Sequence, residues 1–408
     1  MTPVVFISAG EASGEQYGAL VATELRRRFA ADGGSVRIFG MGGPRMEAAG
    51  VERVVRSEDV AVMGLTEVLR HLPRIYREYQ KLKKAIKERR PDVAVLIDFP
   101  EIHFRLAREF KRLGVPVIYF VSPQIWAWKE HRIRLVREYV RRMLTIFPFE
   151  EAYYRERGVE AEFVGHPLAE MAMPAITREE FAAENGLDAA KTWVGLLPGS
   201  RVPEILKNLK GMVDAAVLLG NEYEYIIPLA PTLTEKQVAR IQGELSSLTL
   251  TGSPPRITFV RDARAALKHA RASVVASGTA TVEAALAGNP FVVVYRVSPV
   301  TYAIAKRVVK VPHVAMVNLI AGKRVVPELI QNDFTAVTIV EQFRRLLPDG
   351  PDRESMIKEL KGVAEALRAR PARVGATNAG AIGRVAEIVI EEMGAEIPIP
   401  AATTQDSK

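Results

Sequence analysis

The chain has 408 residues, of which 48% are apolar, 25% charged and 7% aromatic. This is the composition of a globular protein, and it excludes a disordered, collagen-like or coiled-coil chain. Lys and Arg outnumber Asp and Glu by 56 to 48, so the net charge is +8. Such an excess favours an anionic partner: a phosphorylated substrate, nucleic acid or an acidic membrane surface. The sequence has no cysteine, which excludes disulfides, thiolate metal ligands and cysteine nucleophiles.

Residues 1–10 carry no basic segment before their short apolar run, so a cleaved signal peptide is not expected. The sequence contains no stretch of about 18 uncharged apolar residues, so no membrane-spanning helix is expected. We therefore expect a cytoplasmic protein.

The first half alternates short apolar runs with longer helical patterns, which is typical of a parallel sheet covered by helices on both faces. Strands are expected at 4–8, 36–39, 93–97, 117–121, 143–147 and 162–164. Helices are expected at 14–29, 65–89, 104–113, 130–139 and 150–157. Residues 1–170 are thus predicted to form a Rossmann-like domain.

The alternation pauses at 165–192, where we expect the linker, and then resumes. Strands are expected at 194–197, 224–227, 257–260, 272–276 and 291–295, and helices at 204–219, 235–245, 263–269, 279–287 and 300–309. Residues 190–350 should form a second Rossmann-like domain, residues 351–394 closing C-terminal helices, and residues 395–408 a disordered tail. The predicted fold class is α/β, with two doubly wound domains facing a cleft.

Two features of the first half point to ligand chemistry. A glycine-rich turn at 10–15 follows the first strand, and its backbone amides could bind an anion or sugar hydroxyls. Asp98 follows a buried strand and precedes Pro100, which fixes the turn there. A carboxylate at the end of such a strand, partly desolvated, suits a general base. The alternatives are a tight turn at 10–15 and a helix cap at Asp98.

The second half has two loops of small residues, each between a strand and a helix. Pro198–Arg201 combines free amides with a guanidinium, and Ser277–Thr279 leads into a helix that carries Glu283. Together they suggest a nucleoside diphosphate site, in which Glu283 holds a ribose diol. Capping boxes at the two helix starts are the alternative. There is no D-x-D motif to hold a bridging metal and no P-loop.

Seven motifs resemble, in order, those of the lipid-A-disaccharide synthases. They are GEASG at 10–14, SPQIWAW at 122–128, FVGHP at 163–167, LPGSR at 197–201, SGTATVEA at 277–284, NLIAG at 318–322 and PELIQ at 327–331. The resemblance implies an inverting glycosyltransferase with two Rossmann-like domains, working without a cofactor or metal. Its expected substrates are UDP-2,3-diacylglucosamine and 2,3-diacylglucosamine 1-phosphate, and its products the β-1,6 disaccharide and UDP.

The resemblance also implies roles for particular residues. Asp98 matches the base that takes the proton of the acceptor 6-hydroxyl. The implied donor UDP site comprises Arg201, Ser277, Gly278, Thr279, Glu283, Asn318, Glu328 and Gln331, and the implied acceptor site Ser13, Gly14, Glu15, Met63 and Gly64. The chain departs from the family pattern at five positions, where the family usually has Asp, Asp, Phe, Asn and Pro: Glu15, Glu101, Ile102, His103 and Val317. We expect His103 to alter the acceptor contacts.

Apolar residues recur at helical spacing over 65–86, and Pro73 should break or bend this helix after Leu72. The portion from Ile75 to Ile86 is expected to cover the sheet, and that from Val62 to Leu72 to form an exposed patch. Five cations lie off the stripe: Arg70, Arg74, Arg77, Lys81 and Lys84. Because the substrates are lipids, we expect peripheral association with an anionic surface, the inner face of the cytoplasmic membrane.

Other patterns carry less weight. Trp126 and Trp128 are expected on one face of a strand-like or turn segment, and the six histidines show no metal-ligand spacing. No nucleic-acid-binding motif occurs. Two other functions remain as alternatives to the glycosyltransferase: a UDP-sugar 2-epimerase of similar architecture, and a non-catalytic sugar-nucleotide-binding regulator.

Overall fold

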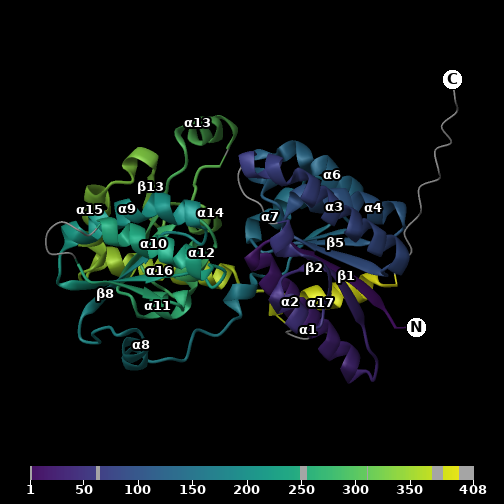
Figure 1. The fold of residues 1–408 in the computed structure, drawn as a ribbon, viewed down its shortest axis with the longest axis horizontal. Coiled ribbons are helices and arrows are strands. Elements are labelled where there is room, and N and C mark those ends of the chain that lie inside the picture. The colour runs from purple at the N-terminus through teal and green to yellow at the C-terminus, as the bar shows by residue number, and fades with distance from the viewer. Residues whose placement is uncertain (1, 61–64, 249–254, 310, 370–379, 395–408) are drawn as a thin grey trace. The chain divides into compact units, whose positions relative to one another are not determined.

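The computed structural model describes residues 2–60, 65–248, 255–309, 311–369 and 380–394. The chain forms two compact units, coloured by residue number in Figure 1. Unit 1 comprises Met1–Glu170 and Leu367–Lys408, and unit 2 comprises Met171–Ala366. The predicted disordered tail at 395–408 and the predicted acceptor residues Met63 and Gly64 lie outside the described residues.

Unit 1 is built on a seven-stranded parallel sheet with the order β3-β2-β1-β4-β5-β6-β7. The strands are β1 (Val4–Ala9), β2 (Arg37–Gly42), β3 (Glu52–Arg56), β4 (Val93–Ile97), β5 (Val117–Phe120), β6 (Arg142–Thr145) and β7 (Ala161–Phe163). All five residues of β4 and all four of β5 are buried. These continuous apolar runs are what a sheet covered on both faces requires.

The helices of unit 1 are α1 (Ala12–Ala31), α2 (Pro44–Ala48), α3 (Leu65–Arg89), α4 (Pro100–Arg112), α5 (Ile125–Trp128), α6 (Ile133–Tyr139), α7 (Pro148–Arg155) and α17 (Gly380–Glu392). Helix α1 packs against α2 and α17, while α3 packs against α4. Single turns of 3₁₀-helix lie at Ser57–Asp59, Glu130–Arg132 and Pro167–Ala169.

Helix α3 continues through Pro73, so of the two predicted outcomes after Leu72, a break or a bend, the break does not occur. Proline removes one donor from the helical ladder. Beyond it, however, Leu82 and Ile86 are buried in the core and Ile75 and Tyr79 pack against it. The burial of this face stabilises a single long helix, because packing rather than backbone preference decides most helices in proteins.

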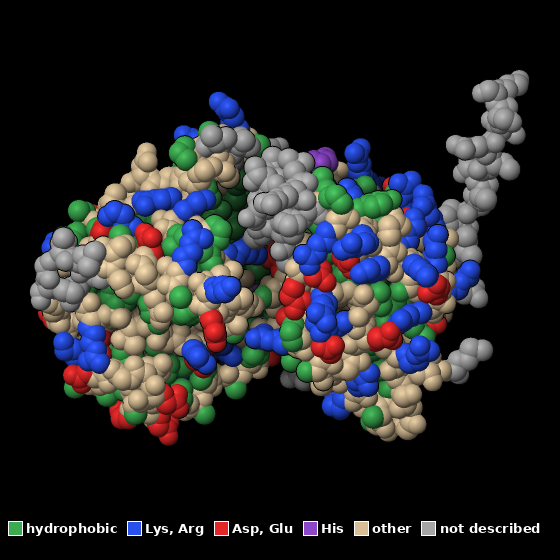
Figure 2. Space-filling model, viewed as in Figure 1, with side chains coloured by type: hydrophobic (Ala, Val, Ile, Leu, Met, Phe, Trp, Pro, Cys, Tyr) green, Lys and Arg blue, Asp and Glu red, His purple; other side chains and the backbone are tan. Residues whose placement is uncertain are grey.

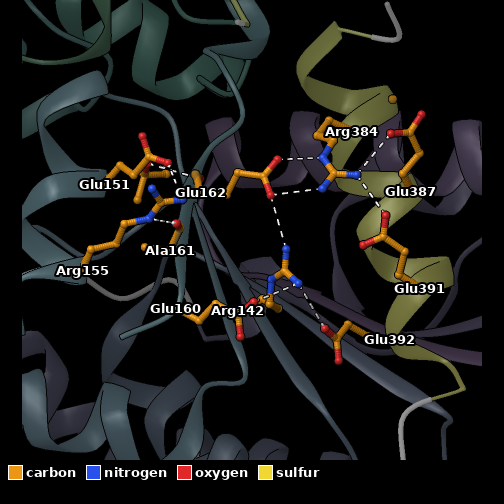
Figure 3. A network of polar contacts seen from close by, with 12 residues as sticks. Arg142, Glu151, Arg155, Glu160, Ala161, Glu162, Arg384, Glu387, Glu391 and Glu392 are labelled. Atoms are coloured by element: carbon orange, nitrogen blue, oxygen red, sulfur yellow. Dashed lines mark hydrogen bonds and ion pairs between the residues drawn. The ribbon is translucent and has the colours of Figure 1, made fainter. Parts of the chain in front are cut away.

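A network of ion pairs attaches α17 to the sheet of unit 1 (Figure 3). Arg384 of α17 donates two hydrogen bonds to Glu162 of β7, at 2.6 and 3.1 Å. Arg142 of β6 contacts both Glu162 and Glu392, at 3.3 and 3.5 Å. Burial alone would raise the pKa of Glu162, but the two guanidinium groups hold it below its ordinary value. Helix α17 therefore belongs to the N-terminal sheet.

Unit 2 has a six-stranded parallel sheet with the order β10-β9-β8-β11-β12-β13. The strands are β8 (Thr192–Leu197), β9 (Tyr223–Pro228), β10 (Ile257–Val260), β11 (Ala272–Ala276), β12 (Phe291–Tyr295) and β13 (Glu328–Ile330). The helices are α8 (Arg178–Asn185), α9 (Val202–Leu219), α10 (Glu235–Leu248), α11 (Ala263–His269), α12 (Thr279–Leu286), α13 (Pro299–Val308), α14 (Met316–Ala321), α15 (Ala336–Leu346) and α16 (Pro351–Ala366). A 3₁₀ turn follows β13 at Gln331–Asp333.

These two sheets confirm the predicted fold class of two doubly wound α/β domains. The helices predicted to close the fold divide between the units, because α16 falls in unit 2 and α17 in unit 1.

Candidate active site

The order of strands reverses once in each sheet. In unit 1 the chain runs outward from β1 to β3 and then returns to place β4 on the other side of β1. In unit 2 the same reversal separates β8 from β11. Ligands of open α/β sheets bind outside the carboxyl ends of the strands at such switch points. The loops that follow β1, β4, β8 and β11 are therefore the candidate site loops.

Asp98 follows β4 in a strained turn. Asp98 and Phe99 both have left-handed backbone angles, with φ of 50° and 52°. Each such non-glycine residue costs about 1–3 kcal/mol, and strain of this kind is concentrated at functional sites. The amide of Asp98 donates to the carbonyl of Phe120 at 3.1 Å. The carbonyl of Asp98 accepts from Tyr119 Oη at 2.7 Å and from His103 Nδ1 at 2.6 Å.

His103 lies inside the protein, on the buried face of α4. Its side chain is fully buried, and burial lowers its pKa to about 4. The neutral ring has one N–H, which Nδ1 must use to donate to the carbonyl of Asp98. Nε2 is then the acceptor for the hydroxyl of Ser8, 2.8 Å away. Both ring nitrogens are bonded to the turn and to β1, and the expected effect of this position on the acceptor contacts stays a prediction.

The glycine-rich loop after β1 is adjacent to the Asp98 turn. A Cβ at Gly10 would lie 2.4 Å from the ring of Phe99, so only glycine leaves room for this ring. Glu15, which is 9% exposed, accepts from the amide of Arg45 at 2.7 Å. It thereby connects the first turn of α1 to the start of α2. Ser13 is half-buried and Gly14 is buried at the start of α1.

The SPQIWAW motif contains a helical turn, α5, so of the two expected forms, a strand-like segment or a turn, the segment is a turn. Trp126 and Trp128 consequently do not share one face. Trp126 donates to Glu150 at 3.0 Å, whereas Trp128 is exposed and has the ammonium of Lys129 3.8 Å from its ring centroid. A helix forms because the amide of Lys129 can reach the carbonyl of Ile125 across one turn, at 3.2 Å.

Glu150 is a buried carboxylate that the sequence patterns did not single out. It accepts from Ser122 at 2.6 Å, from Trp126, and from the amide of Phe147 at 3.2 Å. Burial raises its pKa to about 7, although its hydrogen bonds act in the opposite direction. No sequence signal indicates it: Glu150 accepts from the amide of Phe147 at the start of α7, but Phe147 has no polar side chain that would complete a capping box.

In unit 2, Arg201 ends the loop after β8 and stands at the N-cap of α9, where it is exposed. Gly199 has a left-handed φ of 126°, and the space beside it is filled by the carboxyl group of Glu204. Glu204 accepts from the amide of Ser200 at 3.3 Å, and burial raises its pKa. The loop is thus an ordered helix start with a cation at its tip.

The loop after β11 has exposed Gly278 and Thr279 at the start of α12. Ser277 donates to the carbonyl of Val314 at 3.3 Å. Glu283 lies one turn into α12, half-buried, and burial raises its pKa. Within the described ranges, its carboxylate makes no hydrogen bond or ion pair. Such a carboxylate is available to accept from a diol.

Asn318, Glu328 and Gln331 form hydrogen bonds within unit 2. The amide of Asn318 donates to Val326 at 3.0 Å and to Glu328 at 2.8 Å, and its oxygen accepts from two backbone amides. Glu328 also accepts from the amides of Val314 and Ala315. Gln331, at φ 55°, bonds both backbone groups of Val297. These side chains fix the segment beside Ser277, and their direct contact with a donor stays a prediction.

Two doubly wound units with loops at their switch points are a fold that glycosyltransferases and sugar-nucleotide epimerases share. Solved structures with this fold include the calicheamicin glycosyltransferase CalG4, with a TM-score of 0.56 and 18% identity over 97% of this chain and 100% of that one. They also include UDP-GlcNAc 2-epimerase from Neisseria meningitidis, with a TM-score of 0.56 and 11% identity over 96% and 99%. The fold alone therefore does not separate glycosyltransferase from epimerase.

The sequence separates them, because the chain belongs to the lipid-A-disaccharide synthase family. The family model described as lipid-A-disaccharide synthetase matches residues 5–374. The chain is 58% identical to the lipid-A-disaccharide synthase of Acidobacterium capsulatum, over 96% of this chain and 98% of that protein. It is 50% identical to that of Koribacter versatilis, over 95% and 97%. The predicted family and the predicted enzyme class, a glycosyltransferase, are confirmed.

Proposed function

We propose that the enzyme transfers 2,3-diacylglucosamine from UDP-2,3-diacylglucosamine to 2,3-diacylglucosamine 1-phosphate with inversion. The products are the β-1,6-linked disaccharide 1-phosphate and UDP. The observation that carries this proposal is the position of Asp98, held in a strained turn at the switch point of unit 1 beside the loop after β1. The names of the relatives supply the product class.

In the proposed reaction, the Asp98 carboxylate takes the proton of the acceptor 6-hydroxyl. The oxygen then forms a bond to the anomeric carbon of the donor from the face opposite the diphosphate. The bond from that carbon to the diphosphate oxygen breaks, and UDP leaves with the electron pair. Attack from the opposite face inverts the anomeric configuration, which gives the β linkage.

Unit 2 is proposed to hold the UDP portion. Arg201 at the tip of the loop after β8 would offer a charged fork to the diphosphate. The helix start at Gly278 and Thr279 would offer amides to the same anion. Glu283, whose carboxylate has no partner among the described residues, would accept from the ribose hydroxyls. The acceptor sugar is proposed to contact unit 1 near Ser13, Gly14 and Glu15.

We also propose that α3 contacts an anionic membrane surface. Leu72 and Tyr76 are 47% and 60% exposed, which is unusual for apolar side chains next to one another on a helix. Tyr76 was expected to cover the sheet, but it faces solvent. Figure 2 shows Lys and Arg side chains gathered over the part of unit 1 where Figure 1 places α3 and α4. The exposed cations of α3 include Arg77, Lys81 and Lys84.

In the described part of the chain, no helix is both long and apolar enough to span a bilayer. The side chains of residues 61–71, which include most of the predicted patch, lie outside the described ones. The proposed contact at the inner face of the cytoplasmic membrane thus depends on Leu72, Tyr76 and the cations that follow them.

The transferase proposal is tested by measuring UDP release from the diacylated donor, with and without the glycolipid acceptor in detergent micelles. UDP should form only when the acceptor is present, and the disaccharide should appear in equal amount. UDP released without acceptor, or an isomerised sugar nucleotide recovered from the reaction, would contradict the proposal.

A further inference from the structure

We propose that His103 is a positioning residue that, together with Tyr119, fixes the turn presenting the Asp98 carboxylate. This inference rests on the proposed role of Asp98 as the base. It concerns a side chain that does not itself reach the substrates, since both ring nitrogens are engaged inside unit 1.

The hydrogen bonds that fix the turn are made to the carbonyl oxygen of Asp98. A carbonyl has two lone pairs, and both are used here: by Tyr119 Oη of β5 at 2.7 Å and by His103 Nδ1 of α4 at 2.6 Å. The direction of this carbonyl sets the peptide plane between Asp98 and Phe99. Because both residues have φ above +45°, a backbone free to relax would leave this conformation. The two donors hold the plane, and with it the direction of the Asp98 side chain.

The donor on His103 is itself fixed in one tautomer. Ser8 Oγ lies 2.8 Å from Nε2, and a neutral ring that donates from Nδ1 must accept there. Ser8 belongs to β1, Asp98 follows β4, and His103 lies on α4. One imidazole thus connects three elements around the switch point. Its ring also packs edge-on against those of Phe99 and Tyr119, with centroids 5.8 and 6.2 Å away.

The chemistry of this contact suggests a matched pair of variants. In asparagine, Nδ2 is as many bonds from Cα as Nδ1 is in histidine, so His103→Asn can still donate to the carbonyl of Asp98. It cannot reach Ser8. His103→Phe fills the volume of the ring but offers no donor at all. The two variants therefore separate loss of the donor from loss of the imidazole.

The test measures kcat, the KM for donor and acceptor, and the affinity for UDP in both variants. We expect kcat of His103→Phe to fall by about 10-fold or more, because a misplaced catalytic group reacts slowly. UDP affinity should stay within about 2-fold, since the proposed UDP residues are in unit 2. His103→Asn should keep kcat within about 3-fold of wild type. In an Asp98→Asn background, His103→Phe should cause no further loss of kcat.

Several results would overturn the inference: a wild-type kcat in folded His103→Phe, an equal loss in His103→Asn, or a further loss of kcat in the Asp98→Asn background. If His103→Phe does not fold, the double variant Ser8→Ala with Tyr119→Phe removes the hydroxyl that bonds to His103 Nε2 and the hydroxyl that donates to the carbonyl of Asp98. An unchanged kcat there also overturns the inference. Failure of the proposed function would give a different result from failure of this inference. If Asp98 is not the base, Asp98→Asn would turn over at the normal rate, whichever residue occupies position 103.

Discussion

At the scale of single residues, the role of Asp98 gives the first prediction. Asp98→Asn keeps the shape of the side chain but cannot accept a proton, so turnover should fall by about 10²-fold or more. The affinity for UDP, measured by calorimetry, should not change, because Asp98 belongs to unit 1 and the proposed UDP residues to unit 2. Near-normal turnover by a folded Asp98→Asn protein would remove Asp98 from the mechanism.

Arg201 and Glu283 should affect different parts of the nucleotide. If Arg201 contacts the diphosphate, Arg201→Ala should lower the affinity for UDP by about 10-fold or more and change the affinity for uridine little. If Glu283 binds the ribose, Glu283→Ala should lower the affinities for UDP and for uridine by similar factors. Titration calorimetry with UDP and with uridine measures this. Arg240→Ala, an exposed arginine of α10, is the matched control. Equal losses of UDP and uridine in Arg201→Ala would make that residue structural.

Candidate site residues could be predicted from the sequence when a carboxylate or a loop of small residues directly follows an apolar strand. Asp98 and the loops at 198–201 and 277–279 have this signature, and the structure has them at the ends of β4, β8 and β11. The sequence could not predict the contacts of His103, because its partners Ser8 and Tyr119 are far from it in sequence. Nor does any spacing rule indicate that Glu150 bonds to Ser122, 28 residues away.

At the scale of elements, segments with a clear local pattern were predicted well whatever their length, and a strand that depends on its neighbour was not. The predicted bounds of α3, β4 and α11 agree with the structure to the residue. The strand β13, of three residues, was not predicted as a strand because its register depends on β12, to which Leu329 pairs through Val294. Helix α3 shows where local rules fail, because burial of its apolar face stabilises the helix by more than Pro73 destabilises it.

The exposed side chains of α3 give a prediction at this scale. Leu72→Glu with Tyr76→Glu should reduce binding to anionic vesicles, because it removes apolar area worth about 25 cal/mol per Å² and adds negative charge. Both positions are exposed, so the fold and the affinity for UDP should survive. Wild-type binding should weaken with salt, since each Lys or Arg near the surface contributes about 1 kcal/mol.

A flotation assay with vesicles containing anionic lipid measures this binding. The matched control is Leu218→Glu with Val337→Glu, which changes two exposed apolar residues of unit 2, 57% and 58% exposed. The control should float as wild type does. If the α3 variant floats as well as the control, α3 is not the membrane contact.

At the scale of the whole molecule, the chain crosses between the units twice, and the residues of unit 1 beside the two crossings contact each other. The amide of His166 donates to the carbonyl of Leu367 at 2.7 Å. Gly165 has φ of 94°, and a Cβ there would lie 2.5 Å from the backbone of Ala369. The sequence could not assign α16 and α17 to different units, since the Arg384–Glu162 pair that anchors α17 spans 222 residues.

Three buried groups of unit 1, His103, His166 and Glu150, make its stability depend on pH. The two histidines and the glutamate change the stability in opposite directions as the pH falls. Burial lowers the pKa of His103 to about 4 and that of His166 to about 3. Both rings are neutral in the fold but take up a proton near pH 6.5 when unfolded, so their contribution is complete above pH 6.5 and is lost as the pH falls. Glu150 acts oppositely, because its pKa is about 7 when folded and near 4.5 when unfolded. Its contribution is lost as the pH rises from 4.5 to 7.

The variants His103→Asn and Glu150→Gln should therefore shift the acid sensitivity in opposite directions. Between pH 7.5 and 5.5, wild type should lose about 1 kcal/mol more stability than His103→Asn, since the unfolded histidine gains a proton over this range and the folded one does not. Glu150→Gln should lose more than wild type, by about 1–2 kcal/mol, since it lacks the group that is stabilised by acid. Urea unfolding at the two pH values, followed by hydrogen exchange in unit 1, measures both changes. Comparing each variant with itself across pH cancels the cost of the substitution. If both variants lost as much stability as wild type, buried titration at these positions would not set the acid response of unit 1.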